Sequence, residues 1–394
     1  MRTENSLPGM EAQAHETTAR ALGSPGTPLA VPSQQPDGPS LSQAASTLSF
    51  GAARRRPNAN GNMAGGIHMP GDRDFVRSSL FPFPPYRLGS AAYIDEARGK
   101  FAKLERLYQI AQSRSWNGKE VLADLLKRHG GIQVEPHQRG PLARIFSLIL
   151  WGELAAWMIS ADLAERLDDV EAKMAATSQA FDEARHFDTM RGYLLELGGE
   201  IPRLDIYTAM LLRMLIDTRS LAHKLLGMQL LAETFAIDVF RTVAERRVEP
   251  VLADLLPYFE RDESRHVALG VLYLPEQLRR LSLPGVISVY AFQARIFTLT
   301  SMTQALHAPD FEALGIDSNQ VARRGLKLQK EAVEQMSETR GVLTLSAPAE
   351  WITFQTLDFL FPPKGQRRST IAEVVNTAGR MVAQAGDYAL SWAA

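Results

Sequence analysis

The chain contains no cysteine among its 394 residues. This absence excludes disulfide bridges, zinc sites built on thiolates, iron–sulfur clusters and a cysteine nucleophile. Any metal ion that the protein binds must therefore be held by histidine and carboxylate side chains. The length allows one large domain with additions, or two domains.

An excess of charge of one sign is also missing, because the formal net charge is only -1. Such a chain has no overall electric field that would attract nucleic acid or an anionic membrane surface. The basic run Arg54-Arg55-Arg56 is too short to change this expectation. We therefore expect no nucleic-acid partner.

Long uninterrupted hydrophobic runs are absent as well. The most apolar stretch, Val286 to Met302, is interrupted by Gln293 and Arg295, which favours a buried helix over a membrane span. The N-terminus lacks the apolar run of a signal peptide, so we expect a cytoplasmic protein. A flavin or nicotinamide fingerprint is missing too, and electrons for redox chemistry would then come from a separate reductase or ferredoxin.

What the sequence does contain is mostly helical. Residues 1–70 are rich in Gly, Pro, Ser, Ala and Gln and are predicted to form a disordered tail. From about residue 91 the apolar spacing is helical and almost nothing alternates with period two, which predicts an all-α protein. Residues 71–310 are expected to form the main bundle and residues 311–394 a helical extension. The predicted helices span 91–113, 117–128, 141–167, 169–197, 203–247 with a break near 217–219, 249–274, 284–307, 318–339 and 368–390.

Glycine and proline mark several of these boundaries. Gly198-Gly199 is expected to close one helix, Pro202 and Pro250 to open two others, and Pro275 to end another.

The sequence also repeats itself at an offset of 80 residues. Asp-Glu-Ala-Arg-His at 182–186 falls on Asp-Glu-Ser-Arg-His at 262–266. Glu153 falls on Glu233, each thirty residues before the glutamate of a Glu-x-x-His motif. A helix pair has therefore been used twice, at 141–197 and at 219–277.

Each pair supplies one Glu from its first helix and a Glu-x-x-His from its second. At a spacing of three residues, Glu183 and His186 lie about 60° apart around a helix, hence on one face. The same holds for Glu263 and His266. Two such pairs packed face to face bring four carboxylates and two imidazoles together, which is the dimetal arrangement of ferritin-like bundles.

These residue types suit two iron ions. Four carboxylates neutralise most of the charge of two divalent ions, two of them can bridge, and each imidazole adds a nitrogen donor while positions stay open for dioxygen. Burying six ionisable groups together without a metal would be costly. Carboxylate-rich sites accept manganese as well as iron, so Fe/Fe and Mn/Fe both stay open.

At these residues, over about 141–275, the chain resembles the ferritin-like diiron-carboxylate superfamily. Oxygen-activating members include multicomponent monooxygenase hydroxylases, acyl-carrier-protein desaturases, the radical-generating ribonucleotide reductase subunit and arylamine N-oxygenases. The resemblance implies a ferritin-like four-helix bundle with additional N- and C-terminal helices. It also implies that Glu153 and His186 bind one metal, that Glu233 and His266 bind the other, and that Glu183 and Glu263 bridge them.

The resemblance extends to the Asp and Arg of both motifs, Asp182, Arg185, Asp262 and Arg265. It implies that Asp182 accepts a hydrogen bond from His266 and Asp262 one from His186, which would fix the imidazole tautomers. The alternative is that these aspartates lie on solvated helix surfaces.

At three positions that distinguish the subfamilies, the chain departs from them. Met190 stands where the reductase subunit has its radical tyrosine, Ile237 where monooxygenase hydroxylases have a threonine, and Phe259 where N-oxygenases have a third histidine. No single subfamily is therefore matched.

Three further residues share the faces of the predicted ligands. Gln229, one turn before Glu233, could orient a ligand or be a hydrogen-bonded core amide. Tyr193 and Tyr273, seven residues after each histidine, could be redox-active or line the pocket, but packing inherited with the duplication is the favoured prediction.

The favoured function is a dioxygen-dependent oxidoreductase that hydroxylates, desaturates or N-oxygenates a small, apolar organic substrate. The symmetric two-histidine site, the chain length and the apolar ligand-bearing helices favour it. The alternatives are a ferroxidase or iron-handling protein and a diiron or Mn/Fe subunit that depends on a partner. Homodimers are frequent in this superfamily, so a homodimer is one expected assembly.

Overall fold

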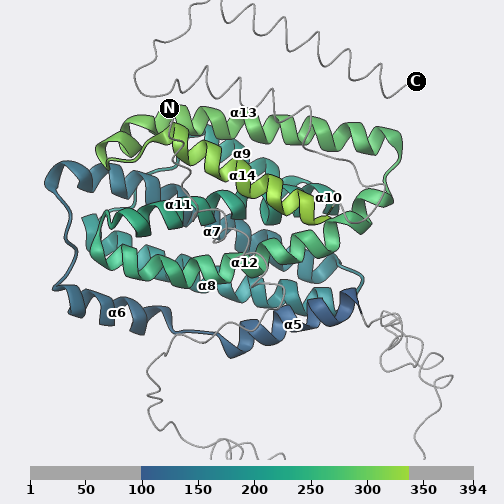
Figure 1. Ribbon diagram of the computed structural model, residues 1–394, viewed down its shortest axis with the longest axis horizontal. Coiled ribbons are helices and arrows are strands. Elements are labelled where there is room, and N and C mark those ends of the chain that lie inside the picture. The colour runs from purple at the N-terminus through teal and green to yellow at the C-terminus, as the bar shows by residue number, and fades with distance from the viewer. Residues whose placement is uncertain (1–98, 337–394) are drawn as a thin grey trace, which may run out of the picture. The chain divides into compact units, whose positions relative to one another are not determined.

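The computed structural model describes residues 99–336, and every regular element in that range is a helix (Figure 1). The prediction of an all-α protein is thus confirmed. The predicted tail at 1–70 and the predicted helix at 368–390 lie outside the described residues. The elements are α5 (Lys100–Ser113), α6 (Gly118–His129), α7 (Pro136–Arg166), α8 (Val170–Gly198), α9 (Ile206–Asp217), α10 (Leu221–Lys224), the π-helix η2 (Leu225–Ala232), α11 (Glu233–Arg246), α12 (Pro250–Arg279), α13 (Leu283–Ala313) and α14 (Ser318–Met336).

The centre of the fold is a four-helix bundle built from the two repeated pairs. Helix α7 packs on α8, α11 packs on α12, and α8 packs on α12. Helices α5 and α6 lie against one side of α8 and α12, while α9, α13 and α14 cover the other side of the bundle (Figure 1). The predicted ferritin-like bundle with additional helices is therefore present in the described range.

Local sequence signals explain where several helices begin and end. Asn117 caps α6 by accepting hydrogen bonds from the backbone N–H groups of Lys119 and Glu120. Helix α8 closes at Gly199, whose φ of 75° is the left-handed conformation that glycine adopts without strain. Helix α12 begins at Pro250, as predicted.

Two boundary predictions are wrong. Pro202 does not open a helix, because α9 begins at Ile206 with Asp205 as its N-cap. Pro275 does not end its helix, because α12 runs on to Arg279 and holds both Pro257 and Pro275 in its interior. A proline inside a helix costs roughly 3 kcal/mol, since it removes one hydrogen bond and crowds the preceding turn. The fully buried Leu274 and nearly buried Leu278 keep this end of α12 in the core and offset that cost.

The predicted break near 217–219 is present, but the segment after it holds a feature that the sequence pattern does not reveal. Helix α9 ends at Asp217, and Ser220 caps α10 through the backbone N–H of His223. The chain then forms the π-helix η2, which ends directly before Glu233. π-Helical turns are rare and occur frequently at functional sites.

One described helix, α7, is long and apolar enough by length and composition to cross a membrane. It is more apolar than the stretch from 286 to 302 that the sequence pointed to. Of its most apolar window, 61% is buried inside the protein, and the helix also carries Glu153. Both features are those of a core helix.

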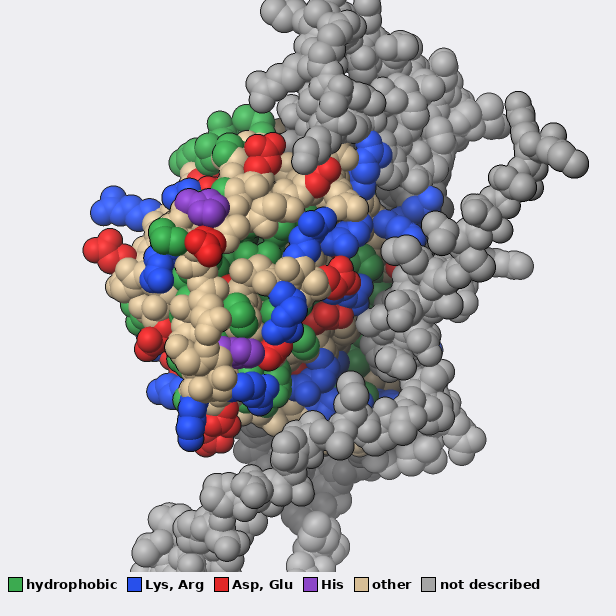
Figure 2. Space-filling view, turned by 60° about the vertical axis from the view of Figure 1, so that its left-hand side comes forward, with side chains coloured by type: hydrophobic (Ala, Val, Ile, Leu, Met, Phe, Trp, Pro, Cys, Tyr) green, Lys and Arg blue, Asp and Glu red, His purple; other side chains and the backbone are tan. Residues whose placement is uncertain are grey.

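Charged side chains of both signs are interspersed over the face shown in Figure 2. This distribution agrees with the formal net charge of -1.

The contact between α12 and η2 predicts that replacing Gly270 of α12 by alanine destabilises the protein. A methyl group at Gly270 would meet the Cβ atom of Gln229 at 2.8 Å, whereas one at Gly152 would meet nothing within 4 Å. We expect Gly270→Ala to lower the free energy of unfolding by about 1–3 kcal/mol through overpacking. Gly152→Ala should instead raise it by roughly 0.5–1 kcal/mol, because alanine favours helix. Urea denaturation followed by circular dichroism measures both, and equal stabilisation by the two variants would contradict the packing of η2 on α12.

Candidate metal centre

The structure brings all six predicted ligands to the middle of the bundle. Each of the four bundle helices contributes: α7 carries Glu153, α8 carries Glu183 and His186, α11 begins with Glu233, and α12 carries Glu263 and His266. None of the six is more than 4% exposed. Their role as ligands stays a prediction until metal is measured.

The donor atoms fall into two overlapping groups of four. Within each group the atoms lie within 4.8 Å of one another. Glu183 and Glu263 belong to both groups, as bridging carboxylates would. Glu153 and His186 complete one group, and Glu233 and His266 complete the other.

Both imidazoles direct Nδ1 toward the carboxylates. His186 Nδ1 lies 3.0 Å from Glu263 Oε1 and 3.6 Å from Glu153 Oε2. His266 Nδ1 lies 2.9 Å from Glu183 Oε1 and 2.6 Å from Glu263 Oε2. Nδ1 is therefore the nitrogen available to a metal on each ring.

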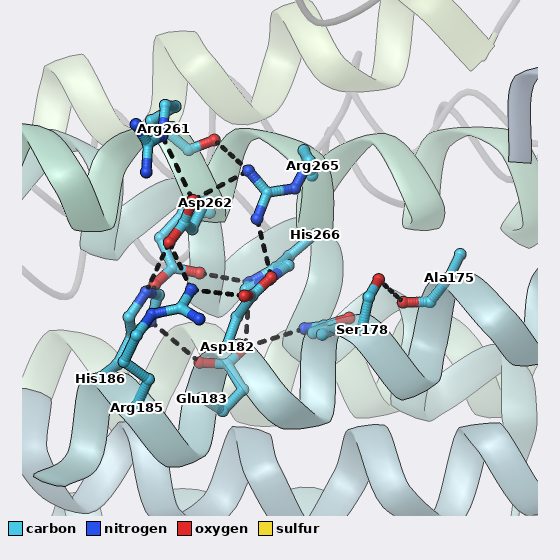
Figure 3. Close-up of polar contacts among 12 residues, drawn as sticks. Ala175, Ser178, Asp182, Glu183, Arg185, His186, Arg261, Asp262, Arg265 and His266 are labelled. Atoms are coloured by element: carbon cyan, nitrogen blue, oxygen red, sulfur yellow. Dashed lines mark hydrogen bonds and ion pairs between the residues drawn. The ribbon is translucent and has the colours of Figure 1, made fainter. Parts of the chain in front are cut away.

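The other nitrogen of each ring faces an aspartate of the opposite motif (Figure 3). His186 Nε2 is 3.3 Å from Asp262 Oδ2, and His266 Nε2 is 3.5 Å from Asp182 Oδ2. These are the crossed contacts that the resemblance implied. The alternative of solvated surface aspartates is wrong, because Asp182 and Asp262 are 1% and 0% exposed.

Two arginines hold the aspartates in place and balance their charge. Arg185 Nη2 donates to Asp182 Oδ1 at 2.5 Å and to Asp262 Oδ2 at 2.8 Å. Arg265 donates to Asp182 Oδ2 at 2.7 Å and to Asp262 Oδ1 at 2.9 Å. Two guanidinium groups thus offset two aspartates, which leaves the four glutamates without a fixed countercharge of their own.

The glutamates that belong to one donor group differ electrostatically from the two that are shared. Burial, reinforced by the charge of Glu263, raises the pKa of Glu153 and Glu233 well above the ordinary value. Burial acts in the same direction on Glu183, but His266 and His186 outweigh it and lower its pKa. For the two histidines, burial opposes the charged form, yet the carboxylates around them raise their pKa well above the usual range. All four shifts of Glu153, Glu233, His186 and His266 favour the protonated form when no metal is bound.

Several buried polar atoms of the site have no hydrogen-bond partner in the described part of the chain. They are Glu153 Oε1, Glu183 Oε2, Glu263 Oε1 and His186 Nδ1. Buried polar atoms in proteins are almost always hydrogen-bonded, so a group of such atoms that lie close together without hydrogen bonds fits a bound ion. Two divalent ions would balance four carboxylates, and the donor set of oxygen and imidazole nitrogen suits iron or manganese. The residues fit a dimetal cofactor.

Gln179 belongs to the site although it was not among the predicted residues. Its Nε2 donates to Glu183 Oε1 and to Glu233 Oε1, both at 3.1 Å, and so joins the two halves of the repeat. It stands four residues before Glu183, a spacing that places it on the same helix face. Gln229 donates to Gln179 Oε1 at 3.4 Å, so it supports this amide rather than a ligand.

Trp116 is the second residue that the sequence did not single out. Its Nε1 donates to Asp262 Oδ2 at 2.7 Å, and the Arg185 guanidinium lies 4.9 Å above its ring. The indole is only half-buried and borders a surface depression. It precedes α6 in a connection between helices, where no periodic pattern marks it.

The residues at the subfamily positions pack in the core. Phe259 stacks on the His186 ring at 4.4 Å and supplies no ligand atom, while Met190 and Ile237 are buried. Tyr193 donates to Glu249 Oε2 at 3.1 Å, which is the packing role expected of it.

A cavity of about 990 Å³ opens beside the metal ligands. It lies between α7 and α11 and is walled by α9, α13 and α14. Glu153 and Glu233 line it, and most of its other lining residues are apolar, including Ile149, Leu230 and Phe297. A pocket of this kind is typical of sites that take small organic molecules.

No protein-family model matches the chain, and no curated protein does. Among solved structures, it is similar to a variant of an R2-like ligand-binding oxidase with aerobically reconstituted Mn/Fe cofactor, at 15% identity and a TM-score of 0.47. That match covers 62% of this chain and 96% of the other. A variant of the R2-like ligand-binding oxidase with Fe/Fe cofactor matches over the same shares at 15% identity and a TM-score of 0.45.

Removing either shared carboxylate is expected to abolish binding of two metals per chain. Glu183 and Glu263 each belong to both donor groups, so Glu183→Ala or Glu263→Ala takes one donor from each metal. Metal content after anaerobic loading with ferrous iron measures the effect. Glu196→Ala, an exposed change on the same helix as Glu183, should keep the wild-type content. Two metals bound to either bridge variant would refute the assignment.

Metal affinity should rise with pH. In the metal-free protein the pKa of Glu153, Glu233, His186 and His266 is raised, so protons compete with a metal for these groups up to a higher pH than usual. Each proton released makes the dissociation constant fall about tenfold per pH unit in the range where that group titrates. Calorimetric titration with manganese(II) in buffers of different ionisation enthalpy counts the protons. Binding without proton release would contradict the proposed protonation.

Proposed function

We propose that the protein is a dimetal oxidoreductase, Fe/Fe or Mn/Fe, that uses dioxygen to hydroxylate, desaturate or N-oxygenate an apolar organic substrate. One observation carries the proposal: Glu153 and Glu233, one predicted ligand of each metal, also line the large apolar cavity. A molecule in that cavity would lie directly beside both metals.

The two sides of the site are built for different tasks. On the histidine side, Asp182 and Asp262 with their arginines hold the imidazoles in one tautomer and keep Nδ1 directed inward. On the cavity side, apolar walls exclude water, which strengthens electrostatic interactions at the reacting centre. The metal pair, when bound, supplies the electrons and Lewis acidity for dioxygen reduction, which no protein side chain provides.

The character of the cavity favours an organic substrate over iron itself. A ferroxidase needs a polar, acidic path for incoming cations. Apart from Glu153 and Glu233, the carboxylate among the described lining residues is Glu331 alone. The walls formed by Ile149, Leu230 and their apolar neighbours instead suit a hydrocarbon surface.

Electrons are proposed to come from a separate reductase or ferredoxin in the cytoplasm. A contact chain supports this: Trp116 at the surface depression donates to Asp262, which faces Nε2 of His186. This chain leads from the protein surface to a ligand on the side opposite the cavity, so an electron donor and the substrate would not compete for one entrance.

Anaerobic loading with ferrous iron, followed by stopped-flow mixing with dioxygen, tests the function. We expect about two irons per chain and a transient visible absorption whose decay a substrate accelerates. Glu183→Ala should lose the transient, and Glu196→Ala should keep it. Oxidation without a transient, followed by uptake of many more irons, would establish a ferroxidase instead. No bound metal would refute the proposal.

A further inference from the structure

The apolar cavity contains a polar cluster that the metal chemistry does not use. Thr208 from the start of α9 and Thr303 and His307 from α13 line the cavity. Asp205, the N-cap of α9, and Asp310 of α13 contact them from behind. Helices α9 and α13 lie against each other, which brings these two sets together (Figure 1).

One face of His307 is fixed. Arg144 pairs with Asp310 through Nε at 3.1 Å and Nη2 at 2.5 Å, and His307 Nδ1 lies 2.9 Å from Asp310 Oδ2. Burial would raise the pKa of Asp310, but the hydrogen bond from Arg144 outweighs it and lowers the pKa. The carboxylate is therefore charged and can only accept, so Nδ1 of His307 donates to it.

The opposite nitrogen of the ring, Nε2, lies within ion-pair distance of Asp205 but makes no hydrogen bond within the described range. His307 Nε2 makes no hydrogen bond with any described residue, although the side chain is only 9% exposed. The nearest charged atom is Asp205 Oδ2 at 3.4 Å. A buried ring nitrogen on a cavity wall that lacks a hydrogen bond is a position where a ligand atom would bind.

The groups around Nε2 are mostly acceptors. Thr208 Oγ1 donates to Asp205 Oδ2 at 2.5 Å, and Thr303 Oγ1 lies 3.0 Å from Thr208 Oγ1. Because the proton of Thr208 is committed to Asp205, Thr303 donates to Thr208. Both hydroxyl protons are then used inside the cluster, and lone pairs remain toward the cavity.

The negative charge of the cluster disfavours anionic ligands. Arg144 offsets Asp310, whereas no lysine or arginine in the described range pairs with Asp205. An incoming carboxylate or phosphate would thus approach beside two carboxylates. An amine or a hydroxyl would donate to His307 Nε2, and the negative charge of Asp205, 3.4 Å from that nitrogen, would favour the donor.

Apolar side chains of α7 that line the cavity separate the cluster from the predicted metal ligands. Arg144 precedes Glu153 by nine residues on α7, roughly 14 Å at 1.5 Å per residue. Ile145, Leu148 and Ile149 lie between them and line the cavity.

We propose that Asp205, Thr208, Thr303 and His307 form a recognition site for an amine or hydroxyl at one end of an elongated substrate. The apolar body of that substrate runs along α7, and its other end lies at Glu153 and Glu233. This placement of the second end rests on the proposed function, while the recognition site itself does not.

Displacement of the apolar fluorophore N-phenyl-1-naphthylamine from the purified full-length protein tests the site. The competitors are decylamine, decyl alcohol, methyl nonyl ether and decanoate, of which only the first two present a hydrogen-bond donor. We expect the amine and the alcohol to displace the fluorophore at concentrations about tenfold lower than the ether and decanoate. Equal potency of all four, or no displacement, would overturn the proposal.

Two variants test whether a preference for hydrogen-bond donors comes from the cluster. His307→Asn keeps a donor toward Asp310 but removes the atom at Nε2, and Asp205→Asn keeps the helix cap but removes the charge. Both should erase the tenfold preference. Gln293→Leu, on the same cavity wall but fourteen residues from His307, should retain it. If both cluster variants keep helical circular dichroism and the full preference, the cluster only joins α9 to α13.

Metal content and dioxygen uptake measured on the same samples separate the two proposals. Two metals with oxygen reactivity but no end-group preference would overturn the recognition site alone. An end-group preference without metal binding would overturn the proposed function and leave the recognition site standing.

Discussion

Four glutamates buried at one point are the constraint on which the rest of this structure depends. The nearby arginines do not offset the repulsion among the glutamates or their loss of hydration. Arg185 and Arg265 instead form ion pairs with Asp182 and Asp262. Only cations or protons can supply the missing charge. The free-energy cost of burying four glutamates is explained if the protein binds two metal ions at a site that excludes water.

The duplicated helix pair solves the problem of holding these groups still. Each motif orients the imidazole of the other through a crossed aspartate contact, so neither half of the repeat forms a complete site alone. Gln179 adds a further link between Glu183 and Glu233. The surroundings of the six predicted ligands are not symmetric. Glu153 and Glu233 border the cavity, whereas the Glu-x-x-His residues do not.

That asymmetry comes from helices outside the repeat. Helices α9, α13 and α14 turn the space between α7 and α11 into a walled cavity, and the start of α9 brings Asp205 and Thr208 to His307. The repeat thus supplies the predicted metal ligands, and the added helices supply walls of the cavity beside them. Under the proposed function, substrate selection would be a property of these helices outside the repeat.

The sequence by itself determined the helical class, the repeat and the six side chains that meet in the candidate metal centre. Glu153, Glu183 and their partners could be read because a helix converts fixed spacing into a shared face, whatever the surroundings. Tertiary packing alone decided the rest. Because of this packing, α12 continues past Pro275, and η2 forms directly before Glu233. Packing also places Trp116 and His307 beside residues that are far away in the chain. Such contacts depend on which helices lie side by side, and no local spacing encodes that.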